Sequence, residues 1–255
     1  MNIYGIIGYP LEHSASPQIF AQKFTEEGID DSEYKKFPLP NIDQLPELIA
    51  KNPSLKGLNV TIPYKEMVVA FADKSGELVK ETGSANTLKI FRKNGNYEVH
   101  AFNTDVYGFG YSLKKHLGRH HRKALILGSG GSSRSVQYAL KKMGVDFLVV
   151  SRQAKAPGMI SYDNLSEGII QSSKLIINTT PLGMYPKTEA KPEIPYQYLT
   201  GDHLLFDLIY NPPMTEFLKS GRKAGAQIIN GEEMLRKQAE SSWEIWQNQK
   251  EISLP

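Results

Sequence analysis

The segment 124–150 constrains the fold of this chain more than any other. An uninterrupted apolar run at 124–127 enters the glycine-rich turn Gly128-Ser129-Gly130-Gly131, and an amphipathic stretch then continues through Met143. A second apolar run follows at 147–150. Such runs are typical of strands buried on both faces, and two of them joined by a helix form a βαβ unit. The segment therefore predicts a parallel sheet covered by helices.

The rest of the chain supports an α/β fold. Predicted strands at 175–177, 204–209 and 227–229 are separated by helical or turn-rich sequence, which predicts a doubly wound parallel sheet in the second half. In the first half we expect a buried strand at 3–8. We also expect a hairpin at Asn94-Gly95, a dipeptide that favours the tight turn between antiparallel strands.

Composition excludes several classes of protein. The formal net charge of +3 suits anionic small molecules better than a nucleic-acid groove. The chain has no cysteine, so disulfides and cysteine-ligated metals are excluded. No apolar run is long enough to span a membrane, and the first residues do not form a signal-peptide pattern. We therefore expect a cytoplasmic protein with a small-molecule partner and with no metal, nucleic acid or membrane.

The glycine-rich turn predicts a dinucleotide site. A strand–turn–helix context gives a Gly-x-Gly motif this meaning, because glycines let the backbone approach a pyrophosphate at the helix N-terminus. An acidic residue about 20 positions further on would bind the ribose 2′-hydroxyl of NAD. Ser151 and Arg152 stand there instead. Arg152, together with Lys155, could accept the 2′-phosphate of NADP; the alternative is an ordinary surface arginine.

The segment 59–65 carries a candidate catalytic lysine. Asn59 and Thr61 alternate with the apolar Val60 and Ile62, which predicts a strand with one buried and one polar face. Pro63 ends that strand and suits the start of a helix, so Lys65 is expected about one turn into this helix.

Other polar residues are candidate partners or ligands. Ser16 precedes Pro17 as a predicted helix N-cap, and the hydroxyls of Ser14 and Ser16 could either only cap the helix or bind a carboxylate. Gln238 lies among apolar neighbours in the last helix, which opens at Gly231. A polar side chain there needs a partner, either within the protein or in a ligand.

Motifs along nearly the whole chain resemble the shikimate dehydrogenase family. They occur in the family's order: His13-Ser14-x-Ser16-Pro17, Asn59-Val60-Thr61-x-Pro63-x-Lys65, Gly83-Ser84-Ala85-Asn86-Thr87, Asn103-Thr104-Asp105, Gly128-Ser129-Gly130-Gly131, Asn178-Thr179-Thr180-Pro181-x-Gly183 and Asn230-Gly231-x-x-Met234-Leu235-x-x-Gln238-Ala239. The resemblance implies NADPH-dependent, reversible reduction of 3-dehydroshikimate to shikimate. The family's Asn-Arg-Thr cofactor motif is altered here, since only Arg152 is kept.

The resemblance also implies roles for individual residues. Lys65 and Asp105 are expected to form a catalytic pair; the alternative is an ion pair that only fastens two segments. Substrate binding is expected of Ser14, Ser16, Asn59, Thr61, Asn86, Tyr210 and Gln238. Cofactor binding is expected of Gly128, Ser129, Gly130, Gly131, Ser132, Ser151, Arg152, Asn178, Thr179, Leu208, Gly231 and Met234.

Domain bounds and rival functions complete the expectations. We expect a substrate-binding domain at 1–104, with 231–255 returning to pack on it, and a Rossmann-like NADP domain at 105–230. One rival reading is a quinate/shikimate dehydrogenase that uses NAD. The other is a nucleotide-sensing regulator that kept the fold and lost the chemistry. Either a monomer or a homodimer fits the sequence.

Overall fold

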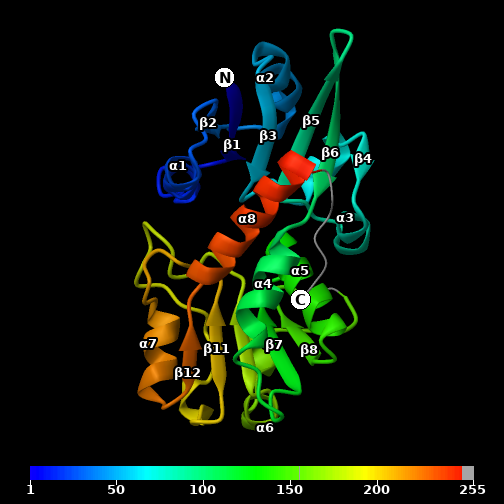
Figure 1. Cartoon of the computed structure of the whole chain (residues 1–255). Helices are drawn as coiled ribbons and strands as arrows, with labels where there is room; N and C mark the ends of the chain where they lie inside the picture. The colour runs from blue at the N-terminus through cyan, green and yellow to red at the C-terminus, as the bar shows by residue number, and fades with distance from the viewer. Residues whose placement is uncertain (155, 249–255) are drawn as a thin grey trace. The chain divides into compact units, whose positions relative to one another are not determined.

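The computed structural model describes residues 1–154 and 156–248. The chain forms two compact units: unit 1 is Met1–Tyr107 with the chain from Arg236 onward, and unit 2 is Gly108–Leu235. Each unit has its own six-stranded sheet (Figure 1). The predicted α/β class is confirmed. Asp105, expected from the sequence at the start of the second domain, lies in unit 1.

The sheet of unit 1 is mixed. Its order is β2-β1-β3-β5-β6-β4. β1 is parallel to β2 and β3, whereas β5 is antiparallel to β3 and β6. The expected hairpin joins β5 to β6, with Asn94 and Gly95 at φ values of 54° and 80°, which suit its tight turn. The strands are β1 Asn2–Gly8, β2 Ser32–Pro38, β3 Leu55–Val60, β4 Lys74–Ser75, β5 Thr87–Lys93 and β6 Asn96–Phe102.

Helices cover both faces of this sheet. α1 (Ser16–Glu27) and α8 (Glu232–Asn248) pack aromatic side chains against Tyr4 on one face. The other face is covered by α2 (Leu45–Lys51), α3 (Glu77–Thr82) and the 3₁₀ helices η1 (Ile42–Gln44) and η2 (Met67–Phe71), over a core that includes Ile7 and Leu58. Because both faces of the sheet are buried, a change of register would misplace the side chains of a whole strand. The register is therefore fixed, and with it the position of the residues at the strand ends.

α8 returns to unit 1 as expected. It packs closely on β3 at Gly57, a residue without a side chain. The indole of Trp246 packs over Gly57 of β3, where a Cβ atom would overlap it. Trp246 also donates a hydrogen bond from Nε1 to the Leu88 carbonyl at 2.9 Å and stacks on Tyr4, with ring centroids 4.8 Å apart. These contacts hold the helix that carries Gln238 on the sheet.

The sheet of unit 2 is wholly parallel. Its order, β12-β11-β10-β7-β8-β9, is the 3-2-1-4-5-6 order of dinucleotide-binding folds counted from β7. This confirms the predicted Rossmann-like sheet. Its strands are β7 Lys123–Leu127, β8 Asp146–Val150, β9 Met159–Ile160, β10 Leu175–Asn178, β11 Leu204–Asp207 and β12 Gln227–Ile229. Its helical segments are α5 Gly131–Lys142, η3 Tyr162–Asn164, α6 Glu167–Ser172, η4 Tyr196–Tyr198 and α7 Glu216–Lys223, while α4 Asp105–Lys114 begins in unit 1.

The prediction for the backbone around Lys65 is wrong. β3 ends at Val60, and Lys65 lies in a turn before η2 rather than in a helix. The Lys65 carbonyl accepts a hydrogen bond from the Ala85 amide at 2.7 Å, so it takes no part in a helical ladder. The predicted alternation fails too, because Asn59 is buried and Ile62 is exposed.

Two further local predictions are wrong. Ser16 is the first residue of α1 and not its N-cap, which is Ala15, and Ala15 has no side-chain acceptor. The stretch 71–82 has a helical pattern with an interruption near Gly76. It is helical after that glycine, in α3, but the part before it contains the short strand β4, which pairs with β6. This pairing depends on a strand distant in sequence, which a local periodicity does not reveal.

Candidate functional site

Sheet register brings four segments of unit 1 to one edge. β1 and β3 run parallel with Ile7 opposite Val60, so the segments after both strands emerge together. β5 runs antiparallel to β3, and Thr87 at its start pairs with Asn59 and with Phe102 at the end of β6. The loops that carry the candidate serines, the lysine, the 83–87 turn and the 103–105 segment therefore meet at this edge.

Lys65 and Asp105 meet there. Lys65 Nζ lies 2.6 Å from Asp105 Oδ2, and the two side chains are 16% and 5% exposed. Asp105 is the first residue of α4. An anion is favoured at a helix N-terminus. The pair is therefore mostly removed from water, yet the lysine retains some access to solvent.

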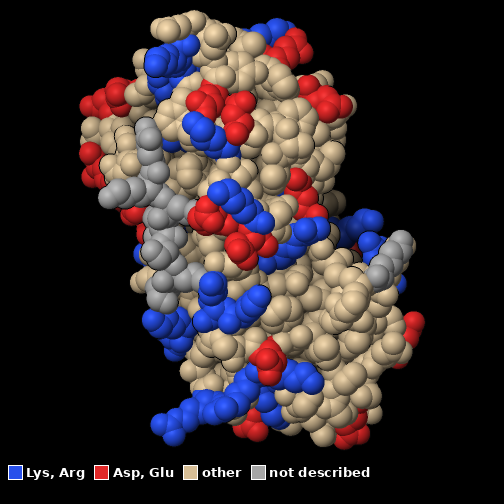
Figure 2. All heavy atoms as spheres, turned by 90° about the vertical axis from the view of Figure 1, so that its right-hand side faces the viewer, with Lys and Arg blue, Asp and Glu red and all other residues tan. Residues whose placement is uncertain are grey.

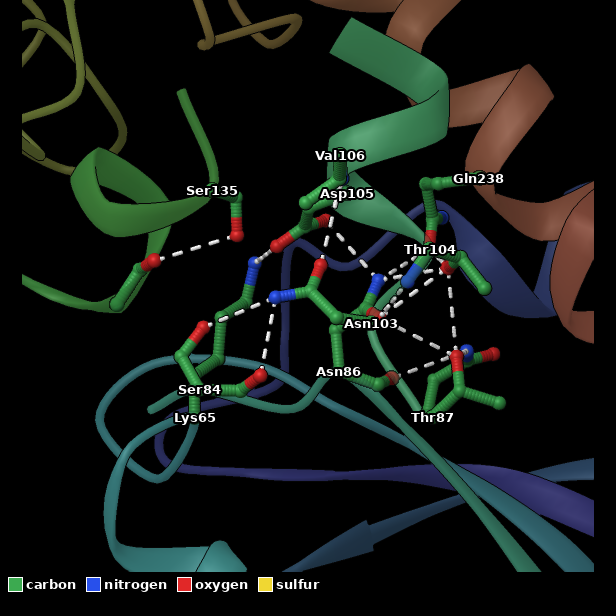
Figure 3. A network of polar contacts seen from close by, with 12 residues as sticks. Lys65, Ser84, Asn86, Thr87, Asn103, Thr104, Asp105, Val106, Ser135 and Gln238 are labelled. Carbon is green, nitrogen blue, oxygen red and sulfur yellow. Dashed lines mark hydrogen bonds and ion pairs between the residues drawn. The ribbon is translucent and has the colours of Figure 1, made fainter. Parts of the chain in front are cut away.

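Asn86 orients the carboxylate of this pair. Its Nδ2 donates to Asp105 Oδ1 at 3.0 Å, while its Oδ1 accepts from the Thr104 amide at 2.7 Å (Figure 3). Asn103 is held in turn, because its Nδ2 donates to the Ser84 carbonyl at 2.9 Å. Each carboxylate oxygen of Asp105 thus has a defined donor, Lys65 on one and Asn86 on the other.

α8 adds Gln238 and Ser242 to the same network. Gln238 Oε1 accepts a hydrogen bond from Asn86 Nδ2 at 3.0 Å. The hydroxyl of Ser242, one turn further on, is 2.8 Å from Thr87 Oγ1 and 3.2 Å from Thr104 Oγ1. The site roles of Ser242, Thr87 and Thr104 were not predicted. The available signal was the helical spacing that puts Ser242 on the same stripe as Gln238.

Asn59 is a buried junction. Its Oδ1 accepts from the Tyr34 hydroxyl at 2.7 Å, and its Nδ2 donates to Ser242 Oγ at 2.9 Å and to the Asn86 carbonyl at 3.3 Å. The amide's hydrogen-bonding capacity is used within unit 1. Asn59 therefore joins β3 to α8 and to the turn that carries Asn86.

The hydroxyls of three predicted substrate residues, Ser14, Ser16 and Thr61, are not part of this network. Within residues 1–154 and 156–248, their hydroxyls form no hydrogen bond. Ser14 and Thr61 are half-buried, and Ser16 is buried at the start of α1. Three hydroxyls that follow neighbouring parallel strands thus keep their hydrogen-bonding capacity for another group.

Unit 2 gathers the predicted cofactor residues at the carboxyl ends of its strands. β7 and β10, the strands at which the order reverses, meet there: the Thr179 amide donates to the Leu127 carbonyl at 2.9 Å. Gly128 has a φ of 111°, a conformation that favours glycine. A Cβ atom at this glycine would lie 2.6 Å from Thr179 Oγ1. Gly130 precedes α5 without a side-chain cap. The first amides of a helix are free of intrahelical bonds and attract anions.

The segment after β8 lies beside the glycine-rich turn. Ser129 Oγ and Ser151 Oγ are 3.3 Å apart, and Arg152 is exposed. Lys155, the second candidate for a phosphate contact, lies outside the described residues. Unit 2 has 16 lysines and arginines and 10 aspartates and glutamates, a formal charge of +6 within a chain of +3. Among the charged side chains of unit 2 that are visible in Figure 2, Lys and Arg cover more of the surface than Asp and Glu. This excess favours a polyanionic ligand.

The remaining predicted residues of unit 2 lie at or just after the ends of β10, β11 and β12, except Met234, which lies in the first turn of α8. Asn178 is fully buried, and Met234 is mostly buried. Gly231 packs so closely on Leu208 that a Cβ atom would overlap the Leu208 carbonyl. Tyr210 is half-buried two residues beyond Leu208, so this predicted substrate residue belongs to unit 2 with the cofactor set.

The structure also bears on other ligand classes. Among residues 1–154 and 156–248, no group of three or more His, Asp or Glu side chains is arranged to hold a metal ion. In the same part of the chain, no helix has the length and hydropathy needed to cross a bilayer.

Comparison with known proteins identifies the family. Residues 6–88 match the model of the shikimate dehydrogenase substrate binding domain. The NADP(+) shikimate dehydrogenase of Methanosphaera stadtmanae is 32% identical, over 96% of this chain and 90% of that protein.

Two crystal structures extend the similarity to the fold. Shikimate dehydrogenase 1 from Peptoclostridium difficile superposes with a TM-score of 0.86 at 33% identity, over 99% of this chain and 94% of that one. The Thermus thermophilus enzyme, crystallised with NADP(H) and shikimate, gives a TM-score of 0.83 at 26% identity, over 96% of this chain and 93% of that one. The chain therefore belongs to the shikimate dehydrogenase family.

Proposed function

We propose that this chain catalyses the reversible NADPH-dependent reduction of 3-dehydroshikimate to shikimate, a step of the shikimate pathway toward chorismate and the aromatic amino acids. The observation that carries the proposal is the Lys65–Asp105 pair, 2.6 Å apart and oriented by Asn86. An oxidoreductase acting on a ketone needs a proton donor beside the carbonyl oxygen. Lys65 is a cation that is held at the functional edge of unit 1 with partial solvent access.

Proton transfer is assigned to Lys65. NADPH, when bound, supplies the hydride that reduces the carbonyl carbon. The ammonium of Lys65 stabilises the negative charge that develops on the carbonyl oxygen and donates a proton to it. In the reverse direction the amine of Lys65 accepts the hydroxyl proton. Asp105 keeps the lysine in place through the 2.6 Å ion pair, and Asn86 limits rotation of the carboxylate.

Substrate contacts are assigned to the polar side chains that the family motifs indicated. Ser14 and Ser16 bind the carboxylate, because hydroxyls donate charge-assisted hydrogen bonds to such a group. Thr61, Asn86 and Gln238 bind ring hydroxyls, and Tyr210 is a further substrate residue of the proposal. Asn59 is assigned to the same set, and it also supports these residues through Ser242.

The residues of unit 2 fit NADP. Gly128, Ser129, Gly130, Gly131 and Ser132 bring the amides at the start of α5 to the pyrophosphate, and helix length supports this role, since α5 runs for 12 residues. Ser151 and Arg152 take the 2′-phosphate. Thr179, Leu208 and Gly231 follow the ends of β10, β11 and β12, and Met234 lies in the first turn of α8. The nicotinamide half of a dinucleotide binds at such strand ends.

One assay separates the proposal from its rivals. Steady-state rates should be measured with shikimate and with quinate, each against NADP and NAD. The proposal predicts the highest kcat/KM for shikimate with NADP. Comparable rates with quinate and NAD would identify a quinate/shikimate dehydrogenase, and nucleotide binding without turnover would identify a regulator. We propose that the protein is cytoplasmic. We also propose that it is a monomer or a homodimer, two states that light scattering distinguishes.

A further inference from the structure

A buried carboxylate in unit 2 has no assigned role. Asp207 ends β11 and is fully buried. Its Oδ1 accepts hydrogen bonds from Asn178 Nδ2 and from the Ile209 amide, each at 3.0 Å, and its Oδ2 accepts from Thr215 Oγ1 at 2.6 Å. Within residues 1–154 and 156–248, no cation forms an ion pair with it.

Asn178 is the first partner and is internal to the protein. Besides donating to Asp207, its Nδ2 donates to the Leu182 carbonyl at 3.4 Å. Its Oδ1 accepts from the Thr180 amide at 3.0 Å and the Thr180 hydroxyl at 2.6 Å. The side chain is fully buried and both its donors and its acceptor are used. Asn178 therefore shapes the loop that starts at Thr179 and has no capacity left for a ligand.

Ile209 and Thr215 are the other partners, and they mark the two ends of the loop after β11. Thr215 is fully buried and caps α7 by accepting from the Leu218 amide at 3.3 Å. The carboxylate thus fixes both the entry to this loop and its exit into α7. Leu208, next to Ile209, is packed against Gly231.

We propose that Asp207 is a positioning residue for NADP binding, which joins the loops after β10 and β11 and so holds Thr179 and Leu208 in register. This inference rests on the proposed function for its ligand. The two loops leave adjacent parallel strands whose final residues, Asn178 and Asp207, are paired in the sheet. Their side chains are bonded to each other, so one carboxylate determines both loops.

The chemistry of the site argues against a purely structural role. Burying a carboxylate without a cationic partner costs stability, and a neutral amide of the same shape would avoid that cost. Burial raises the pKa of Asp207 to about 7, against the opposing effect of the three hydrogen bonds. A buried carboxylate that lowers the stability of the fold, and that joins two loops at the predicted cofactor site, is typical of functional sites.

The test uses Asp207→Asn, Thr215→Val and Thr215→Ser in the full-length protein. NADPH affinity is measured by fluorescence titration without substrate, alongside KM for NADP, kcat and the melting temperature at pH 8. Asp207→Asn and Thr215→Val should raise the NADPH Kd and the KM about tenfold, with kcat changed less than threefold. Thr215→Ser keeps the hydroxyl and should restore wild-type affinity.

The outcomes are distinguishable. A lowered melting temperature with unchanged NADPH Kd in both Asp207→Asn and Thr215→Val would overturn the inference and leave a structural role. If Asp207→Asn does not fold, Thr215→Val against Thr215→Ser decides alone. A wild-type protein that binds no NADPH would refute the proposed function itself, which is a separate result.

Discussion

Lys65 Nζ and Asp105 Oδ2 lie 2.6 Å apart although 40 residues separate them in sequence. Both belong to unit 1, and Asn86 from a third segment fixes the free oxygen of the carboxylate. An ion pair whose anion is almost fully buried and whose cation retains solvent access is suited to exchange a proton with a ligand. A pair that only fastened two segments would gain nothing from that partial access.

The first prediction concerns the cofactor phosphate. Arg152→Ala should weaken NADP binding about ten- to a hundredfold and leave NAD nearly unchanged, because a charge-assisted contact contributes roughly 1.5–3 kcal/mol. Dissociation constants for both nucleotides measure this. Arg222→Ala, which removes another exposed charge in the last turn of α7, is the control and should change neither. Equal losses for NADP and NAD in Arg152→Ala would contradict the assignment.

The second prediction concerns the substrate carboxylate. Ser14→Ala and Ser16→Ala should mainly raise KM for shikimate, since the carboxylate is bound alike in ground and transition states. Because Ser16 is not the N-cap of α1, its loss should leave the melting temperature nearly unchanged. Ser54→Ala, an exposed serine at the opposite end of β3, is the control. Wild-type KM in both variants would place the carboxylate elsewhere.

The third prediction concerns the docking of α8. Gly57→Ala places a methyl group against the indole of Trp246 and should destabilise the protein by about 1–3 kcal/mol. Chemical unfolding measures the loss. Gly168→Ala in α6 is the control, because a Cβ there meets no atom, and it should be neutral or stabilising by up to about 1 kcal/mol. Equal stability of the two variants would show that α8 does not depend on this close approach.

The fourth prediction concerns pH. The folded pKa of Asp207, about 7, lies above its model value of 3.8 because the carboxyl is buried. The folded protein therefore binds more protons between these values, and this group's contribution to stability falls as pH rises from about 4 through about 7. Among the described residues, Tyr196 interacts electrostatically with Asp207, and its own pKa is raised by burial.

Asp207→Asn lacks this titration. Its unfolding free energy relative to wild type should therefore increase between pH 5 and pH 8, by up to a few kcal/mol. Urea unfolding at both pH values measures the change. Asp202→Asn, an exposed carboxylate before the same strand, should show no such trend. Parallel pH profiles for Asp207→Asn and wild type would show that the carboxyl does not titrate in this range.

Sequence was sufficient where one local rule decided the structure. The apolar runs around the glycine-rich turn predicted the parallel sheet of unit 2, because strands buried on both faces have few alternatives. Asn94-Gly95 predicted the hairpin, since both residues accept positive φ. The family motifs alone indicated Lys65 and Asp105.

Sequence was insufficient where distant partners decided the structure. The backbone of Lys65 is held by Ala85, so the helical spacing that follows Pro63 was misleading. Ser242 lies 155 residues from Thr87, and no spacing rule links a serine on a helix to a threonine on a strand at that distance. In the sequence, Asp207 is one polar residue near the end of an apolar strand. Its burial and its three hydrogen-bond donors are seen only in the structure.

The central claim is that Lys65 transfers the proton, and kcat of Lys65→Met with shikimate and NADP tests it most directly. The variant should fold with a melting temperature near wild type, bind shikimate, and lose about 10²–10⁴ in kcat. Lys56→Met, an exposed lysine of β3, should keep full activity. An active Lys65→Met protein with a lowered melting temperature would make the Lys65–Asp105 pair structural and remove Lys65 from the mechanism.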